Sequence, residues 1–181
     1  MKKINVLSCF DGMSCGQIAL ERAGVPVNKY YASEIDKYAI KVTQSHYPNT
    51  IQLGSIVNWE EWIDEIETPD LLIGGSPCQG FSNAGQGLNF EDPRSKLFFT
   101  FVNIRNYLVQ KNPDLKFMLE NVKMKKAWSE IITEQMGVEP VLIDSALVSA
   151  QSRKRLYWTN FFITQPEDKH IYLKDIIETV S

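Results

Sequence analysis

Two chemically reactive side chains stand directly after apolar runs of the sequence. Cys78 follows the run Asp70–Gly75 and comes directly behind Pro77, whose ring fixes the local backbone. Glu120 closes the stretch Phe117–Leu119, and an apolar setting of this kind raises the pKa of a carboxyl group. A cysteine thiolate is a nucleophile and a carboxyl group with a raised pKa is a proton donor, which together suit covalent catalysis. The common alternatives are a buried structural cysteine and a strand-end acid paired with a nearby arginine.

A glycine-containing turn and a later acid form a second group. The apolar run that ends at Cys9 leads into the turn Phe10–Gly16, where two glycines allow a tight bend and close backbone approach before a helix. Glu34 follows about twenty residues on, at a position from which a carboxylate can accept both hydroxyls of a ribose. The pair predicts a nucleoside-cofactor site. An ordinary strand-to-helix turn is the alternative.

Short apolar runs alternate with helical patterns along almost the whole chain. Strands are predicted over Ile4–Cys9, Lys29–Ser33, Thr50–Leu53, Asp70–Gly75, Leu115–Glu120, Glu139–Ala146 and Arg155–Asn160. Helices are predicted over Cys15–Ala23, Tyr38–His46, Trp59–Ile66, Lys96–Gln110 and Lys125–Met136. This alternation predicts an α/β domain with a mostly parallel seven-stranded sheet covered by helices on both faces. Ligands collect at the carboxyl ends of strands in such sheets, so the reactive residues are expected to meet there.

Composition sets the broad class of the protein. A chain of 181 residues with 44% hydrophobic types suits one domain. Its 19 Lys and Arg against 22 Asp and Glu give a net charge of −3, so contact with nucleic acid must be local or come from another chain. The 3 cysteines are too few for a disulfide framework or a four-cysteine zinc site, and no metal is expected. The apolar run before Asp11 is too short for a signal peptide or a membrane span, which favours a soluble, cytoplasmic protein.

Four motifs in this order resemble the cytosine-C5 DNA methyltransferases. They are Phe10-Asp11-Gly12, Gly74-Gly75-Ser76-Pro77-Cys78-Gln79, Glu120-Asn121-Val122 and Gln151-Ser152-Arg153-Lys154-Arg155, within a match from Ile4 to about Phe162. The cofactor turn and Leu97-Phe98-Phe99 look most like the animal de novo enzymes, whereas Pro77 to Ser82 looks bacterial or phage-like. The resemblance implies a Rossmann-like, S-adenosylmethionine-dependent methyltransferase domain over residues 1–165. Residues 166–181 would begin a connection to a target-recognition region.

The resemblance also implies a reaction, methyl transfer from S-adenosylmethionine to C5 of cytosine in DNA. Cys78 would add to C6 of a flipped base, and Glu120 would share or donate a proton at N3. Arg155 would hold the cytosine O2, while Arg153 would steady the site or a phosphate. Asn121 would orient the segment that carries the nucleophile. These roles follow from the family and not from the spacing of the residues.

The same resemblance assigns the cofactor contacts. Phe10 would lie against the adenine, Glu34 on the ribose, and Ile35 and Ile56 on the two adenine faces. The methionine end would be surrounded by the backbone of Asp11, Gly12, Met13, Ser14 and Cys15, with Pro77 and Leu97 nearby. Where the family usually has Gly-Asp for the adenine amino group, this chain has Gly54-Ser55-Ile56. Ser55 would accept that hydrogen bond as a neutral and shorter group, which weakens cofactor affinity.

The expected partner is duplex DNA with a flipped cytosine, covered by the long loop Gly80–Arg94 as a lid. Family members continue after Arg155 into a target-recognition region and two closing motifs, and only Ile171–Ile177 resembles the beginning of that connection. Three interpretations stay open. The chain is the catalytic half of a split enzyme completed by a second polypeptide, or it is a minimal bacterial or phage enzyme that acts with low specificity or as a homo-oligomer. The third interpretation is a non-catalytic remnant that binds cofactor or a partner. An RNA substrate is a further alternative, since relatives act on tRNA.

Overall fold

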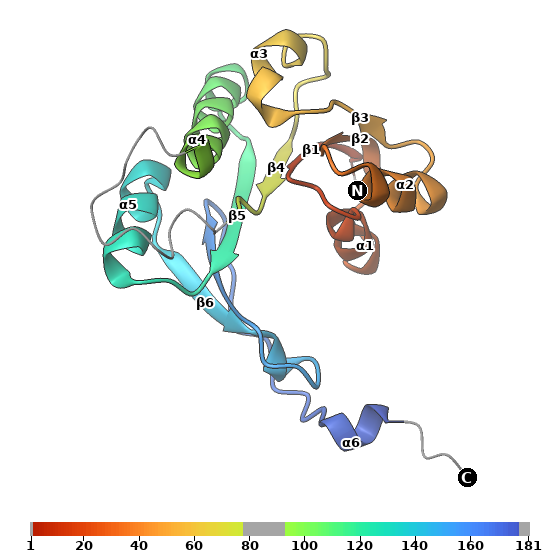
Figure 1. Ribbon diagram of the computed structural model, residues 1–181, viewed down its shortest axis with the longest axis vertical. Coiled ribbons are helices and arrows are strands. Elements are labelled where there is room, and N and C mark those ends of the chain that lie inside the picture. Colours follow the sequence, from red (N-terminus) through yellow and green to blue (C-terminus); the bar gives the residue numbers. More distant parts are fainter. Residues whose placement is uncertain (1, 78–92, 178–181) are drawn as a thin grey trace.

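The computed structural model describes residues 2–77 and 93–177, and seven strands within them form one sheet (Figure 1). The strands are β1 (Ile4–Cys9), β2 (Val27–Ser33), β3 (Ile51–Gln52), β4 (Leu71–Gly74), β5 (Lys116–Val122), β6 (Pro140–Asp144) and β7 (Lys154–Thr159). Their order across the sheet is β3-β2-β1-β4-β5-β7-β6. β7 runs antiparallel to its neighbours β5 and β6, and the other pairs are parallel. The predicted α/β fold with a mostly parallel seven-stranded sheet is confirmed.

Helices connect most of the strands. They are α1 (Cys15–Arg22), α2 (Lys37–His46), α3 (Trp59–Trp62), α4 (Pro93–Lys111), α5 (Lys126–Met136) and α6 (Leu173–Ile176), with the 3-10 turns η1 (Ile56–Asn58) and η3 (Ser145–Leu147). Asp36 begins α2 because its carboxylate accepts the N–H groups of Tyr38 and Ala39. Gly137 ends α5 with a φ of +68°. The helix predicted over Trp59–Ile66 is shorter than expected, and α6 has no counterpart among the predicted helices.

Helices lie on both faces of the sheet, but they cover the two faces unequally. Figure 1 shows α4 and α5 on one side and α1 and α2 on the other. The large core lies under α4 and α5 and includes Leu72, Phe98, Phe101, Leu119 and Trp158. The buried cluster on the α1 side contains Val6, Tyr30, Ala32 and Ile73, and α1 itself has no buried residue. On the α1 side, therefore, parts of β4, β5 and β7 stay accessible.

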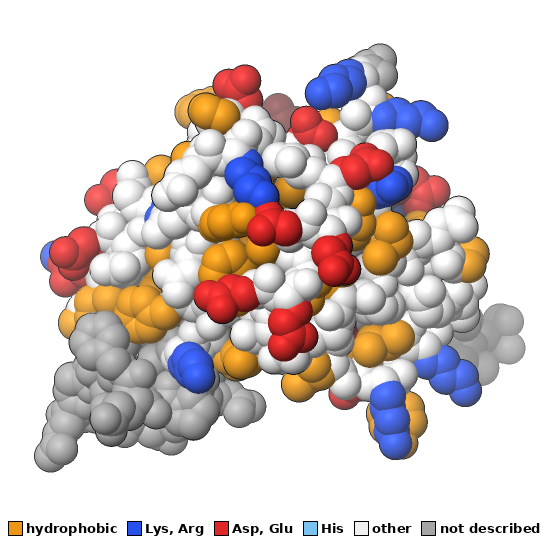
Figure 2. All heavy atoms as spheres, turned by 90° about the horizontal axis from the view of Figure 1, so that it is seen from above, with side chains coloured by type: hydrophobic (Ala, Val, Ile, Leu, Met, Phe, Trp, Pro, Cys, Tyr) orange, Lys and Arg blue, Asp and Glu red, His pale blue; other side chains and the backbone are white. Residues whose placement is uncertain are grey.

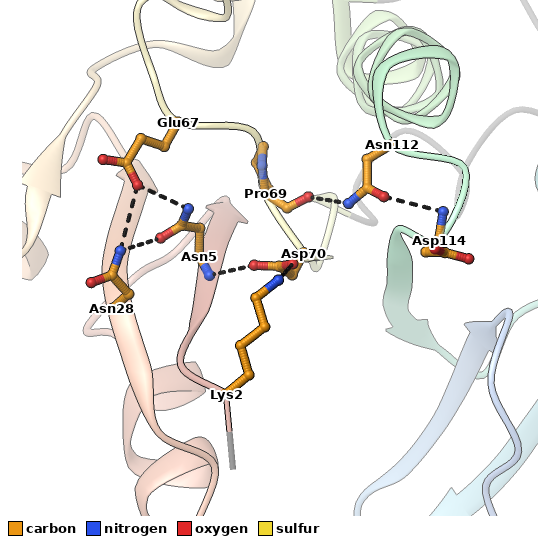
Figure 3. A network of polar contacts seen from close by, with 8 residues as sticks. All are labelled: Lys2, Asn5, Asn28, Glu67, Pro69, Asp70, Asn112 and Asp114. Carbon is orange, nitrogen blue, oxygen red and sulfur yellow. Dashed lines mark hydrogen bonds and ion pairs between the residues drawn. The ribbon is translucent and has the colours of Figure 1, made fainter.

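Polar side chains tie the amino ends of the strands together (Figure 3). The carboxylate of Asp70, next to β4, accepts the backbone N–H of Asn5 in β1 at 2.9 Å. The amide of Asn5 donates to Glu67 at 3.1 Å and accepts from Asn28 of β2 at 2.9 Å. Asn112, after α4, donates to a backbone carbonyl ahead of β4 at 3.0 Å. These bonds satisfy backbone and side-chain groups at this edge, so it serves the stability of the sheet.

Candidate functional site

The sheet changes its winding direction between β1 and β4. From β1 the chain moves outward through β2 and β3, and it then returns to the other side of β1 with β4. The loops after two such strands diverge and leave a crevice for a ligand. A cavity of about 350 Å³ lies at this place, lined by residues that include Phe10, Asp11, Cys15, Gly75, Glu120 and Tyr157. A larger cavity of about 620 Å³, beside Arg105 and Phe117, lies towards the amino end of β5 and holds none of the predicted site residues.

The turn between β1 and α1 has an unusual backbone. Phe10, Gly12 and Ser14 each have a φ of +58°, a conformation that costs energy for the two that are not glycine. Glu34, at the end of β2, helps to hold the turn because its Oε2 accepts the N–H of Gly12 at 2.8 Å. Its Oε1 accepts the N–H of Ile35 at 2.7 Å. The predicted ribose acid therefore lies beside the predicted glycine turn. Oε1 of Glu34 also accepts the N–H of Asp36 at 2.8 Å, so three of the roughly four lone-pair directions of the carboxylate are used and one is left for a ligand hydroxyl.

The other predicted cofactor residues differ in accessibility. Met13 and Ile35 are exposed, Ile35 to 76% of its surface, and both can meet a ligand. Ser55 accepts a backbone N–H of η1 at 3.2 Å, so its hydroxyl already caps that turn. Ile56 is only 5% exposed and packs in the large core, so little of its side chain can touch a ligand. Of the other two predicted residues, Pro77 is exposed and Leu97 is half-buried.

The carboxylate of Glu120 points towards the end of β4. A Cβ placed on Gly75 would lie 2.9 Å from Glu120 Oε2, so the absence of a side chain at Gly75 makes room for the carboxylate. The apolar setting predicted for Glu120 is wrong, because Nε of Arg155 lies 2.6 Å from Glu120 Oε1. The alternative interpretation, an acid paired with an arginine, describes the structure. Register explains the pair: Glu120 is opposite Tyr157 on β7, which brings Arg155 next to it on the same face.

Asn121 joins the end of β5 to the segment that leads to Cys78. Its buried amide donates to the carbonyl of Ser76 at 3.3 Å and to the Ser76 hydroxyl at 3.1 Å. This contact is the one expected of a residue that orients the segment after β4. Cys78 itself and the predicted lid up to residue 92 lie outside the described residues.

Arg153 and Arg155 are held by different means. Arg155 also donates from Nη1 to the carbonyl of Lys154 at 2.9 Å. Arg153 is exposed and precedes β7, and its backbone N–H donates to Asp144 at 2.8 Å. Asp144 also accepts the Ser152 hydroxyl at 2.9 Å, so one carboxylate shapes the turn that presents Arg153. Sequence reasoning missed this role of Asp144. It would have been found if the pairing of β6 with β7, which brings Asp144 close to Ser152 and Arg153, had been known.

Tyr157 is a further residue that the motifs did not single out. It lines the cavity beside Glu120 and is half-buried. Burial, followed by the charge of Glu120, raises the pKa of Tyr157. Its hydroxyl is therefore a neutral hydrogen-bonding group at physiological pH.

The two described cysteines differ in reactivity. Burial, followed by the charge of Asp11, raises the pKa of the Cys9 thiol well above its usual range, so Cys9 is no nucleophile at neutral pH. Cys15 is exposed at the start of α1.

Within 2–77 and 93–177, no His, Cys, Asp and Glu side chains gather in a group that could hold a metal ion. No helix in the described part of the chain is both long and apolar enough to span a bilayer.

Charge is unevenly distributed over the surface. Figure 2 views the molecule from the end at which α3 lies and shows acidic side chains over the middle of that face. Glu60 and Glu61 in α3 and Asp64 after it contribute, and Asp64 forms an ion pair with Lys111. A face with this charge is unfavourable for a polyanion. Several exposed cations lie at the carboxyl edge of the sheet, among them Lys123, Lys125, Lys126, Arg153 and Lys154.

The winding of the sheet defines a Rossmann-like α/β domain, and its cavity lies at the carboxyl ends of β1 and β4, where domains of this class bind their ligands. The C-5 cytosine-specific DNA methylase family model matches residues 4–161, and the chain belongs to this family. It is 35% identical over 175 residues to the orphan methyltransferase M.SPRI of Bacillus phage SPR, covering 87% of this chain and 37% of that protein. It is 29% identical over 191 residues to the type II methyltransferase M.NlaX of Neisseria lactamica, covering 96% of this chain and 59% of that protein. The chain thus spans between about a third and three fifths of these relatives.

Solved structures support the fold. The S. pombe Dnmt2 methyltransferase superposes with a TM-score of 0.69 at 20% identity, over 91% of this chain and 53% of the other. A Spodoptera frugiperda DNMT2 variant superposes with a TM-score of 0.63 at 20% identity, over 93% of this chain and 54% of the other. At this identity the likeness concerns the fold, and it agrees with the observed strand order.

Proposed function

We propose that this chain is the catalytic domain of a DNA cytosine-C5 methyltransferase that uses S-adenosylmethionine. One observation carries the proposal: in a member of the C-5 cytosine-specific DNA methylase family, Phe10, Asp11 and Cys15 of the turn after β1 line the same cavity as Glu120, whose carboxylate is paired with Arg155. The turn suits a nucleoside ligand and the pair suits proton transfer beside a bound base.

The residues around the turn fit S-adenosylmethionine. A Cβ placed on Gly12 would meet no described atom within 4 Å, so space for a ligand lies directly against the turn. Glu34 would accept a ribose hydroxyl, and the backbone from Phe10 to Cys15 would follow the methionine end. Ile35, being exposed, would cover the adenine. When bound, S-adenosylmethionine supplies an electrophilic methyl group.

The catalytic roles divide among four residues. The thiolate of Cys78 would form a bond to C6 of the cytosine, which moves electrons towards N3 and makes C5 nucleophilic. Glu120 would donate or share a proton at N3, where that charge develops. Arg155 would hold Glu120 through Nε and offer further N–H donors to the cytosine O2. Arg153, exposed on the turn that Asp144 shapes, would contact a phosphate.

The substrate proposed is duplex DNA with the cytosine flipped into the cavity, since the family to which the chain belongs is that of the C-5 cytosine-specific DNA methylases. A second candidate is the catalytic half of a split enzyme. It is favoured by the accessible sheet face beside α1, where an α/β domain of this kind normally packs another helix. A second polypeptide would then cover that face.

A methyl-transfer assay with labelled S-adenosylmethionine tests the proposal on duplex DNA and on RNA. The protein is assayed alone and with a candidate partner polypeptide, and Glu120→Gln is compared with Glu130→Gln on the exposed face of α5. We expect transfer to DNA, a loss of at least about a hundredfold for Glu120→Gln, and no effect of Glu130→Gln. Transfer only with the partner supports the split enzyme. Transfer to RNA and not to DNA contradicts the proposed substrate.

The covalent step has its own test. On DNA that contains 5-fluorocytosine, the wild type should accumulate a stable protein–DNA adduct, because fluorine replaces the C5 proton whose removal normally lets the thiolate leave. Cys78→Ala should form none and should also lose methyl transfer. An active preparation without adduct, or activity that survives Cys78→Ala, contradicts covalent catalysis through Cys78.

A further inference from the structure

A buried polar network lies beneath the turn between β1 and α1. Asp11, Ser14, Tyr30 and Thr43 are between 0% and 9% exposed. The Tyr30 hydroxyl, from β2, donates to Asp11 Oδ1 at 2.8 Å, and the Ser14 hydroxyl donates to Asp11 Oδ2. Thr43, from α2, donates to the Ser14 hydroxyl at 3.2 Å. Two neighbouring elements thus reach the turn from outside it.

The network acts where the backbone needs support. Ser14, one of its members, has a positive φ, and so do Phe10 and Gly12 on either side of Asp11. Such a conformation persists only where surrounding contacts hold it. Asp11 is fixed at both oxygens by hydroxyl donors, so the residue at the centre of the turn cannot rotate freely. The turn is therefore preorganised by this network, and Phe10, Asp11 and Cys15 line the cavity beside it.

Tyr30 is built into this corner of the fold. A Cβ placed on Gly16, in the first turn of α1, would lie 2.7 Å from the Tyr30 hydroxyl and 2.6 Å from Ile73. Burial, followed by the charge of Asp11, raises the pKa of Tyr30 well above its usual range. The phenol therefore stays protonated at neutral pH and serves Asp11 as a permanent donor.

We propose that Tyr30 and Thr43 are positioning residues of the cofactor site, which hold Asp11 and Ser14 so that the turn keeps its ligand-binding shape. Neither side chain needs to touch the ligand. The inference rests on the proposed function, because it takes the turn to be the S-adenosylmethionine site. It adds that affinity is set in part from β2 and α2, by residues outside the motifs.

The neighbouring tyrosine provides a matched control. Tyr31 is on the same strand and equally buried at 3%, but it belongs to the core on the opposite face. Its hydroxyl accepts the backbone N–H of Glu67 at 3.1 Å, at the amino edge of the sheet. Tyr30→Phe and Tyr31→Phe each remove one buried hydroxyl together with its hydrogen bonding, so they separate loss of stability from loss of positioning.

The experiment measures the Kd of the full chain for S-adenosylhomocysteine by calorimetry, together with thermal unfolding without ligand. Tyr30→Phe should raise the Kd about tenfold, Thr43→Val about threefold, and Tyr31→Phe less than about twofold, although both tyrosine variants lower the unfolding temperature. If wild type binds and Tyr30→Phe binds as tightly as Tyr31→Phe, the positioning role is wrong and the proposed function stands. If wild type binds no S-adenosylhomocysteine, the proposed function fails and the inference with it. Should Tyr30→Phe not fold, Thr43→Val takes its place in the comparison with Tyr31→Phe.

Discussion

Replacing Asn121 by alanine should loosen the connection between β5 and the segment after β4. The side chain is 2% exposed and takes part in three hydrogen bonds. It donates to the carbonyl and the hydroxyl of Ser76 and accepts the N–H of Val122 at 2.8 Å. Truncation to alanine leaves these groups without their partner in a place where Ser76 is 5% exposed, so water replaces the bonds poorly.

The size of the effect follows from these contacts. An orphaned buried polar group costs about 1–3 kcal/mol, and the Ser76 hydroxyl can rotate to a new partner, so the total loss in free energy of unfolding should be about 2–4 kcal/mol. With a urea m-value of about 2 kcal/mol/M for a domain of this size, the urea midpoint should fall by about 1–2 M. Methyl transfer should fall as well, because Ser76 and Pro77 lead directly to the proposed nucleophile.

The control is Asn103→Ala, an asparagine exposed on α4. Its free energy of unfolding should change by no more than about 0.5 kcal/mol, because an exposed site away from special contacts tolerates truncation. Circular dichroism during urea unfolding measures both variants. Equal midpoints for Asn121→Ala and Asn103→Ala would refute the argument that Asn121 clamps the segment after β4.

Three further outcomes are expected. In the folded protein, iodoacetamide at pH 8 should label the exposed Cys15 and spare Cys9, because burial raises the pKa of the Cys9 thiol. Peptide mass spectrometry measures the labelling, and equal rates at the two cysteines would contradict this. The backbone N–H of Ala146, followed by the Ser152 hydroxyl and the N–H of Arg153, holds the pKa of Asp144 below its usual range. The ionised carboxylate therefore stabilises the fold fully above about pH 4, and this contribution is lost as the pH falls through the folded-state pKa. The difference in unfolding temperature between wild type and Asp144→Asn should therefore shrink between pH 6 and pH 3. Gly75→Ala should lower the kcat of methyl transfer about tenfold with little change in stability, because the new Cβ displaces only the flexible end of the Glu120 side chain. An unchanged kcat would contradict the position given to the Glu120 carboxylate.

The sequence predicts the strands that end at the site better than the contacts within the site. β1 is predicted to the residue and β4 to within one residue at either end, because each is a short, mainly apolar run closed by a polar or glycine-containing turn. The adjacency of Phe10 and Glu34 also follows, since consecutive parallel strands bring their carboxyl ends together.

The contacts that could not be predicted depend on pairing between distant segments. Glu120 and Arg155 meet because β7 returns antiparallel beside β5, and neither composition nor periodicity fixes that register. The same holds for the hydroxyl of Tyr30, which reaches Asp11 only because β2 pairs with β1. A tyrosine in a strand is usually a core residue, so its type alone carries no signal of a polar role.

The net charge of −3 gains a more specific meaning from the structure. Acidic side chains occupy the end of the molecule around α3, whereas Lys123 and Lys125 follow β5 at the carboxyl edge and Arg153 precedes β7 beside it. Because screening limits each charge to about 10 Å at ordinary ionic strength, DNA at that edge would respond to the nearby cations more than to the total charge. A small number of phosphate contacts gives little sequence discrimination, since phosphates position a duplex while base edges identify it. Under the proposed function, phosphate contacts at this edge would bring a cytosine to Glu120, and contacts beyond this edge would choose which cytosine.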